Sequence, residues 1–347
     1  MKKNLIKFLA LFSVGVLIFL AVFSFVGFGK ISAAISELYL PLYIIVIGLG
    51  ALDISVWSSR WGIFVHQKHP EVSHFSLLKN LLVGLAMNHI SPLFKMGGEP
   101  ARVYLLKVKN GIKGREGLAT VTSDLTMEFI IDVVMVILGM VLFLVFFSPP
   151  IWIYGILTVF IVMSLVLVFG IVGIYSGQRI FYRFIGWLCE KVGRLKKYEE
   201  RLTEAYSTFS ENFRETMKNK GLLTKGIGLT VIRKIIAVVK YYLIFAALGY
   251  SVNLTVIVIA IGVGYMLMMI PATPGGLGIF EGGMISVFVL LGISPAVAAT
   301  VVFLDRIIWY WSIMTIGSTL GTYYGINLLN AADIKSTNRL ENKESRE

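Results

Sequence analysis

The sequence predicts an all-α, polytopic integral membrane protein with six full spans and two re-entrant, broken-helix hairpins in an inverted-topology repeat. Of its 347 residues, 56% are hydrophobic and only 15% are charged, a composition typical of membrane proteins. A stretch rich in glycine and proline, residues 271–281, interrupts one of the most apolar regions. A similar stretch occurs in the first half of the chain, at residues 88–102.

The break at residues 271–281 reads Pro-Ala-Thr-Pro-Gly-Gly-Leu-Gly-Ile-Phe-Glu. Its prolines and glycines exclude a continuous helix. Unpaired backbone groups are costly in lipid, so a break at membrane depth is tolerated only where protein or a water-filled cavity satisfies them. The alternative is a tight loop between two ordinary spans, outside the bilayer.

The earlier stretch indicates an internal duplication. Pro92 aligns with Pro271, Gly97 and Gly98 with Gly275 and Gly276, Glu128 with Arg306, and Gly139 with Gly317. The offset stays between 178 and 180 residues, close to half the chain. A constant offset of this size is the sequence pattern that a repeat produces.

Six apolar segments are long enough to cross a bilayer. They are residues 8–28, 38–58, 117–147, 151–175, 222–248 and 295–324. The first follows several lysines, as in a signal peptide, but its run of about 20 apolar residues exceeds the roughly 7–15 of a signal peptide, so we expect a span.

Shorter apolar segments flank the breaks. Residues 77–91 are too few for a comfortable crossing, and the limb after the first break is too basic to cross lipid. Residues 254–270 and 279–291 flank the second break. We therefore expect two re-entrant hairpins, each of which enters and leaves on one side of the membrane.

The formal net charge is +12, and the basic residues cluster in connecting segments, which indicates topology rather than nucleic-acid binding. With six spans, all the basic segments can be cytoplasmic, so we expect a multi-pass protein of the cell membrane with both termini in the cytoplasm. The hairpins then enter from opposite sides, as in transporters built from inverted repeats.

We expect a single transmembrane domain followed by a disordered cytoplasmic tail. The basic amphipathic segment within the domain should form helices on the membrane surface. The bounds are 1–332 for the domain, about 5–147 and 151–326 for its halves, 177–220 for the amphipathic segment and 333–347 for the tail.

Known catalytic and cofactor motifs are missing from the sequence. The single cysteine cannot form an intramolecular disulfide, and the four histidines lack His-x-x-x-His spacing. No Walker loop, dinucleotide fingerprint or nucleophile elbow is present. We therefore expect no cofactor, no metal, no catalytic residue and no nucleic-acid partner.

Ionisable residues within apolar segments are the candidates for function. Glu99 and Arg102 follow the first break, and Arg102 either contacts substrate or extends to the cytoplasmic interface. Asp124, Glu128 and Asp132 share one helical face, with Asp124 near enough to the end to be interfacial.

The duplication suggests a central ion pair between Glu128 and Arg306, either in a cavity or as a structural link between the halves. Arg233 and Lys240 share a helical face and either neutralise a phosphate or anchor the helix. The predicted substrate-binding residues are Glu99, Arg102, Glu128, Asp132, Arg233, Lys240, Pro274, Gly275, Gly276, Gly278, Glu281 and Arg306.

These motifs resemble the lysylphosphatidylglycerol synthase transmembrane family, also called flippase-like or UPF0104 proteins. The resemblance covers roughly residues 5–326, and the Pro-x-x-Pro-Gly-Gly-x-Gly-x-x-Glu run is its most specific part. Arg60-Trp61 also resembles a family feature, whereas Phe129 stands where many members have a basic residue. Its best-known member, the bacterial multiple peptide resistance factor, has an N-terminal membrane region that flips lipids.

The resemblance implies a lipid flippase that moves an anionic phospholipid or lipid-linked headgroup between leaflets, passively or coupled to an ion. No soluble synthase domain follows the sixth span, so we do not expect lipid aminoacylation. An intramembrane enzyme acting on lipid phosphates and a scaffold for a lipid-modifying enzyme are the alternatives. Membrane lipids are the expected partners, and the oligomeric state stays open, a homodimer being one option.

Overall fold

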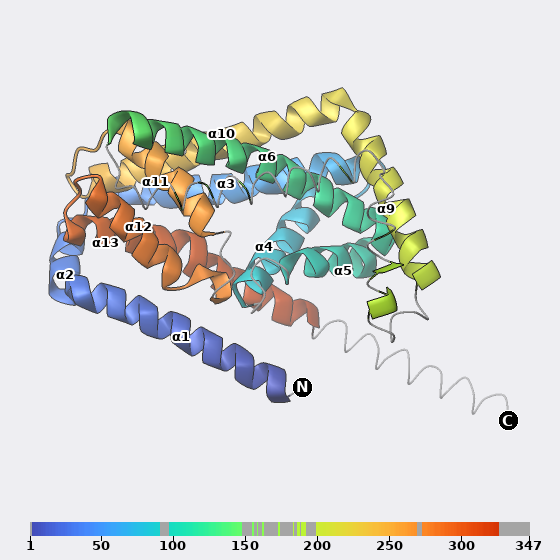
Figure 1. Ribbon diagram of the computed structural model, residues 1–347, viewed down its shortest axis with the longest axis horizontal. Helices are drawn as coiled ribbons and strands as arrows, with labels where there is room; N and C mark the ends of the chain where they lie inside the picture. Colours follow the sequence, from blue (N-terminus) through green and yellow to red (C-terminus); the bar gives the residue numbers. More distant parts are fainter. Residues whose placement is uncertain are drawn as a thin grey trace.

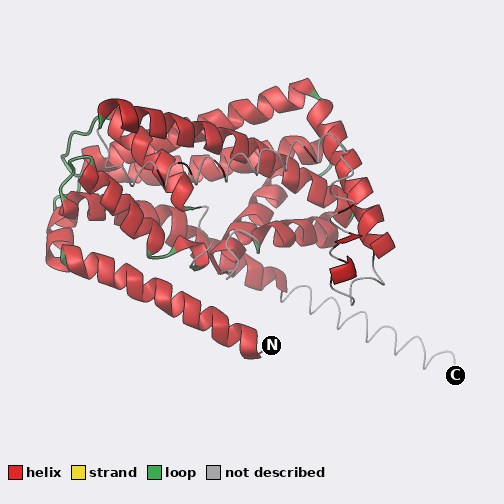
Figure 2. Cartoon of the chain, viewed as in Figure 1, coloured by secondary structure: helices red, strands yellow, loops and turns green. Residues whose placement is uncertain are grey.

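The computed structural model describes residues 2–90, 97–147, 199–268 and 273–325, with isolated positions between 155 and 191. Within these residues all regular secondary structure is helical (Figure 2). The all-α prediction is therefore confirmed for the described part of the chain. Pro92, Pro271, most of the predicted span at 151–175 and the predicted tail at 333–347 lie outside it.

The helices of the described residues follow one another along the chain with these bounds. They are α1 (Lys2–Val26), α2 (Phe28–Ser36), α3 (Leu40–His66), α4 (His74–Ile90), α5 (Gly98–Asn110), α6 (Gly114–Phe146), α9 (Glu199–Lys218), α10 (Lys220–Ala247), α11 (Leu254–Leu267), η2 (Pro274–Gly276), α12 (Ile279–Leu290), α13 (Pro295–Arg306) and η3 (Ile307–Ser312).

Three of these helices are long and apolar enough to cross a membrane. They are α3, α6 and the continuous helix Pro295–Gly325, with 27, 33 and 31 residues. Helix α3 extends beyond its predicted end at residue 58, so Arg60 and Trp61 lie within it. The first predicted span, residues 8–28, is followed by a sharp bend that the sequence did not predict: α1 and α2 meet at an angle of 74° at Gly27. The φ angle of Gly27 is 98°, a conformation that favours glycine.

The two halves of the chain repeat one order of elements, namely long helix, short helix, break, short helix and long helix. Helices α10, α11, α12 and α13 begin 180 or 181 residues after α3, α4, α5 and α6, respectively. The same pairs also contact one another in each half, including α3 with α4, α5 with α6, α10 with α11, and α12 with α13. This order agrees with the duplication inferred from the sequence.

The two short helix pairs occupy opposite ends of the bundle (Figure 1). The α4–α5 pair lies toward α9, and the α11–α12 pair lies toward α2. Their broken ends meet, because η2 contacts α4 and Gly275 lies against the side chains of His89 and Tyr310. The described residues beside the two breaks, far apart in the sequence, therefore meet inside the protein, and we call this contact the junction of the breaks.

Glycines allow the halves to interlock. A Cβ atom at Gly139 of α6 would lie 3.3 Å from Cα of Gly262 in α11, and one at Gly317 would meet the carbonyl oxygen of Leu82 in α4. Gly139 and Gly317 are equivalent in the duplication, so each half packs its last long helix closely on the first short helix of the other. Small residues permit such close helix contacts in membranes.

Part of the predicted amphipathic segment is helix α9. Its Phe213 and Met217 pack against Phe64 of α3 and Met127 of α6. The predicted helix is confirmed over Glu199–Lys218, and these two apolar residues near its end are covered by protein. Contact of its basic face with lipid headgroups stays a prediction.

The close crossing of α6 and α11 leads to a test by substitution. In Gly262→Ala the new Cβ would lie 2.9 Å from the carbonyl oxygen of Met135, so we expect a loss of about 1–3 kcal/mol from overpacking. Gly48→Ala is the control, since nothing lies within 4 Å of its Cβ position. Thermal unfolding of the purified variants should rank Gly262→Ala lowest, and equal stability of the two variants would contradict the close crossing.

Candidate functional site

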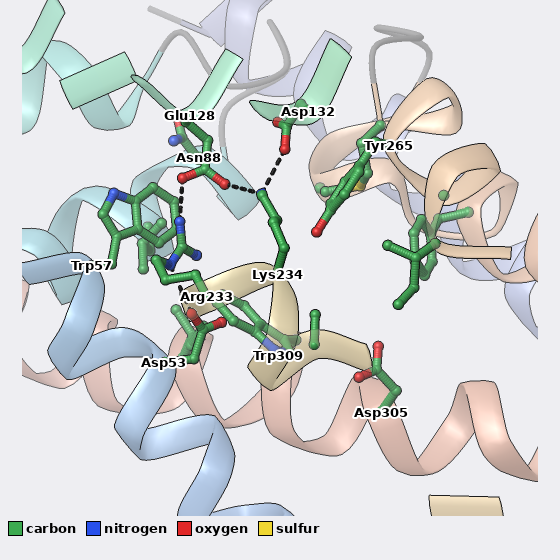
Figure 3. Close-up of a pocket in the computed structure, with 18 of the residues that line it drawn as sticks. Asp53, Trp57, Asn88, Glu128, Asp132, Arg233, Lys234, Tyr265, Asp305 and Trp309 are labelled. Carbon is green, nitrogen blue, oxygen red and sulfur yellow. Dashed lines mark hydrogen bonds and ion pairs between the residues drawn. The ribbon is translucent and has the colours of Figure 1, made fainter. Parts of the chain in front are cut away.

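A cavity of about 230 Å³ lies between the two halves (Figure 3). Helices from both halves line it, and the junction of the breaks forms part of its wall. Its charged lining residues are Asp53, Glu99, Glu128, Asp132, Arg233, Lys234, Lys240, Asp305 and Arg306. Aromatic side chains, including Trp57, Tyr265 and Trp309, and aliphatic side chains complete the wall.

Glu128 of α6 is the most connected acid of the cavity. One carboxylate oxygen, Oε2, accepts hydrogen bonds from Arg60 of α3 and Arg233 of α10. The other oxygen accepts one from Lys234 Nζ at 2.5 Å, and Lys234 also contacts Asp132 at 2.6 Å (Figure 3). A single carboxylate therefore joins three helices, two from the first half and one from the second.

A second carboxylate, Asp124, lies one turn earlier on α6. It accepts hydrogen bonds from Arg60 Nε at 2.7 Å, Arg102 Nη2 at 2.8 Å and Trp57 Nε1 at 3.1 Å. Asp124 is fully buried. Asp124 is therefore not a solvated residue, because the basic residues around it come from α3 and α5 and bury it within the protein. Its depth in the membrane stays a prediction.

Four acids and four bases make up this set, which we call the polar network: Asp53, Asp124, Glu128, Asp132, Arg60, Arg102, Arg233 and Lys234. Its formal charges cancel. Aromatic rings cover several of the cations, since Arg233 lies over Trp57 at 4.1 Å and Arg102 over Trp61 at 4.0 Å. Pairing and cation–π contacts offset the cost of removing these charges from water.

The network includes a contact between equivalent positions of the two halves. Arg233 Nε donates to Asp53 Oδ1 at 2.7 Å, and the two residues are 180 positions apart. The ion pair of Arg60 with Asp124 also has an equivalent, because Lys240 and Asp305, 180 and 181 positions later, pair at 2.5 Å. Buried ion pairs thus recur at a spacing close to the one inferred from the sequence.

A separate ion pair lies beside the second break. Arg306 Nε contacts Glu281 Oε1 at 2.5 Å, and both side chains are buried. The other oxygen of Glu281 accepts the backbone N–H of Gly278 at 2.6 Å, which caps the start of α12. Glu281 thus binds a cation and holds the glycine-rich turn in place.

The predicted pair of Glu128 and Arg306 is wrong. Glu128 faces α3 and α10, whose bases surround it, whereas Arg306 is bound by Glu281 of α12. An alignment of the two halves shows which positions correspond, but it does not show which side chains are in contact. The contact depends on how the helices pack.

The predicted site residues divide into two groups. Those that line the cavity are Glu99, Glu128, Asp132, Arg233, Lys240, Gly275 and Arg306. Those outside the cavity lining are Arg102, Pro274, Gly276, Gly278 and Glu281, which are buried. In this second group Arg102 is bound to Asp124, and Gly276 and Gly278 have positive φ angles of 69° and 85° that shape the turn.

Sequence reasoning missed several residues of the network. The sequence places Arg60 at the basic end of a span, yet it is fully buried. One sequence pattern could have indicated that Arg60 is buried: Asp53 and Arg60 are seven residues apart and therefore share a face of α3. Lys234 and Asp305, which the sequence analysis leaves without a role, both line the cavity.

Glu99 differs from the other acids of the cavity. It accepts a hydrogen bond from Asn88 Nδ2 at 3.3 Å, and no ion pair to it occurs among the described residues. Its Oε2 is buried and has no hydrogen-bond partner in the described part of the chain. In the same described part, no cluster of three or more histidine, cysteine or acidic residues has the arrangement of a metal site.

These features define a helical membrane protein with a charged internal cavity. The chain belongs to the family described as lysylphosphatidylglycerol synthase TM region, which matches residues 5–317. The resemblance inferred from the sequence motifs is thereby confirmed.

Similar proteins occur in archaea. A UPF0104 membrane protein of Methanothermobacter thermautotrophicus is 30% identical over 90% of this chain and 94% of its own length. UPF0104 membrane proteins of Pyrococcus horikoshii and Methanocaldococcus jannaschii are 25% and 26% identical, over 92% and 89% of this chain and 96% and 93% of their lengths. No solved structure matches the chain.

The polar network predicts unequal effects of two similar substitutions. Glu128→Gln leaves buried bases without their shared counter-ion, so we expect a loss of about 3–5 kcal/mol of stability. Glu99→Gln removes a carboxylate that has no ion pair among the described residues, so its stability should stay close to wild type. Thermal unfolding of both variants in one detergent tests this, and equal losses would show that Glu128 does not hold the network together.

Proposed function

We propose that this protein is a lipid flippase that moves an anionic phospholipid or lipid-linked headgroup between membrane leaflets. The observation that carries the proposal is the cavity of about 230 Å³, lined by charged side chains between the two halves. Ionisable side chains inside a membrane are costly and usually mark a substrate or ion pathway. A headgroup in this cavity would exchange water for protein contacts while its acyl chains stay in lipid.

The proposal includes an architecture of six spans and two re-entrant hairpins related by an inverted-topology repeat. Three observations support it: the repeated order of helices, the meeting of the two breaks, and the bond between Asp53 and Arg233. In a two-fold arrangement, two corresponding residues contact each other only near the symmetry axis, so the contact between Asp53 and Arg233 would mark the position of that axis. Transporters built in this way place their substrate site at the interface of the repeats.

We further propose that the end of the bundle formed by the α3–α4 and α5–α6 connections and α9 faces the cytoplasm of the cell (Figure 1). Several of the basic connecting segments lie there, and basic loops favour the cytoplasmic side. Both termini would then be cytoplasmic. The α11–α12 pair would enter from the opposite side.

Glu99 is the residue that we propose couples transport to an ion. The formal charges of the polar network cancel, so an additional carboxylate in the cavity attracts a proton or another cation. Glu99 lies at the start of α5, beside the first break, where a change in its charge would act on the junction of the two hairpins. Passive transport is the simpler alternative, and in that case the charge of Glu99 would not affect the rate of lipid transport.

A leaflet-resolved assay tests the function directly. The purified protein is reconstituted in vesicles that contain a fluorescent phosphatidylglycerol, and a membrane-impermeant quencher reports how fast the inner-leaflet lipid reaches the outside. Faster exchange than in protein-free vesicles supports the flippase. A new lipid species on chromatography would instead favour an intramembrane enzyme, and absence of both would favour a scaffold.

For Glu99→Gln we expect the flip rate to lose its dependence on pH, because the amide cannot take up a proton. The measurement is the same vesicle assay at several pH values, with folding checked by thermal unfolding. The control is Lys68→Gln, which removes one partner of the exposed ion pair with Glu215 at the end of the bundle. An unchanged pH profile in Glu99→Gln would contradict coupling through this residue.

A further inference from the structure

Arg306 is the cation of the cavity that keeps an unused donor. It is the last residue of α13, only 3% of it is exposed, and it lines the cavity. Its Nε contacts Glu281, but its buried Nη2 has no hydrogen-bond partner among the described residues. A buried charged donor without an acceptor is costly, so an acceptor in the cavity would stabilise it.

The other cations that line the cavity are more fully paired. Arg233 contacts Asp53 and Glu128, Lys234 contacts two acids of the polar network, and Lys240 contacts Asp305. Arg60 and Arg102 also keep a buried nitrogen without a hydrogen bond among the described residues, but neither lines the cavity. An anion that enters the cavity therefore finds its available guanidinium donor at Arg306.

The surroundings fix the guanidinium in position. Its Cζ lies 4.3 Å from the ring centre of Phe280 and 5.3 Å from that of Tyr310. Glu281 contacts the Nε atom of this guanidinium group through one carboxylate oxygen. Its side chain is fixed in turn, because the other oxygen caps α12. Aromatic contacts and one fixed acid thus hold the group, while its buried Nη2 atom has no acceptor among the described residues and would reach an anion in the cavity only after a small shift of the side chain.

The local backbone adds a second donor. The π-helical turn Ile307–Ser312 begins directly after Arg306, and such turns occur frequently at functional sites. It carries Tyr310, whose hydroxyl is buried and has no hydrogen-bond partner among the described residues. Tyr310 is not itself part of the cavity lining, but its ring lies 4.6 Å from that of His89, against Gly275 and 5.3 Å from Arg306 Cζ, so the ring adjoins the guanidinium behind the cavity wall.

We propose that Arg306 and Tyr310 form an oxyanion subsite that binds the phosphate group of the lipid headgroup. This inference rests on the proposed flippase function and specifies where the headgroup is held. Guanidinium and hydroxyl donors match the several acceptor oxygens of a phosphate. Glu281 is a positioning residue that competes with the phosphate for the same guanidinium, so binding of the headgroup loosens the cap of α12.

Opposite effects of two substitutions test the subsite. Removal of the guanidinium in Arg306→Gln should weaken phospholipid binding about tenfold or more, as expected for a lost charged hydrogen bond. Glu281→Gln leaves the guanidinium without its competitor and should tighten binding. Quenching of tryptophan fluorescence can report binding, because Trp309 lines the cavity. The probe is dioctanoyl phosphatidylglycerol, with dioctanoylglycerol as the lipid that lacks phosphate and inorganic phosphate as the free ion.

A second pair of variants separates binding from folding. Arg306→Met combined with Glu281→Gln removes both charges of the buried pair, so the protein keeps its balance of charge but has no donor, and it should bind phospholipid as weakly as Arg306→Gln. Tyr310→Phe removes the hydroxyl alone and should weaken binding without altering the ring contacts. The surface variant Lys68→Gln is the control and should bind as wild type.

The result can contradict the subsite or the function separately. Equal binding of dioctanoylglycerol and phosphatidylglycerol, or unchanged phospholipid binding in the Arg306 variants, would overturn the subsite even if the wild-type protein flips lipid. Binding of inorganic phosphate without phospholipid would overturn the headgroup assignment. Phospholipid binding that is lost with Arg306, in a protein that flips no lipid in vesicles, would support the subsite and contradict the proposed flippase.

Discussion

The structure depends on neutralising charges that it buries. Glu128 contacts Arg60, Arg233 and Lys234, and these contacts tie α6 to α3 and α10. A buried ion pair contributes little more stability than apolar residues of similar size, but a buried ion that loses its partner is strongly destabilising. Each helix must therefore lie where its charged side chains reach their partners. A chain built only for stability would fill this space with apolar residues. The retention of so many charges is what the proposed entry of a polar headgroup would require.

The second constraint is the backbone of the two breaks. Interrupted helices expose N–H and C=O groups that lipid cannot satisfy, so the breaks have to be covered by protein. Among the described residues, η2 of the second break lies against α4, which leads into the first break, and Gly275 lies against His89. The interlocking contacts of Gly139 and Gly317 bring the short helices of each half against the other half. The same packing that protects the broken backbone thus creates the cavity between the halves.

Much of this arrangement could be predicted from the sequence because it is local. Apolar length, prolines and glycines located most of the described helices and the interruption between α11 and α12, and four-residue spacing placed Asp124, Glu128 and Asp132 on one face. The partners of these acids could not be predicted, since pairing depends on which helices pack together. Arg60 illustrates this limit: a basic residue near the end of an apolar run usually marks the interface, and only the tertiary structure shows that it lies inside.

The two acids beside the breaks differ in their partners. Glu281 is paired because Arg306, on the following long helix, reaches it at 2.5 Å. Glu99, beside the first break, accepts a hydrogen bond from Asn88 and has no ion pair among the described residues. Glu128 takes its bases from α3 and α10, and Glu99 is left as an additional carboxylate in the cavity. One break thus carries a closed ion pair and the other an acid without an ion pair among the described residues, so the charges beside the two breaks are not balanced in the same way.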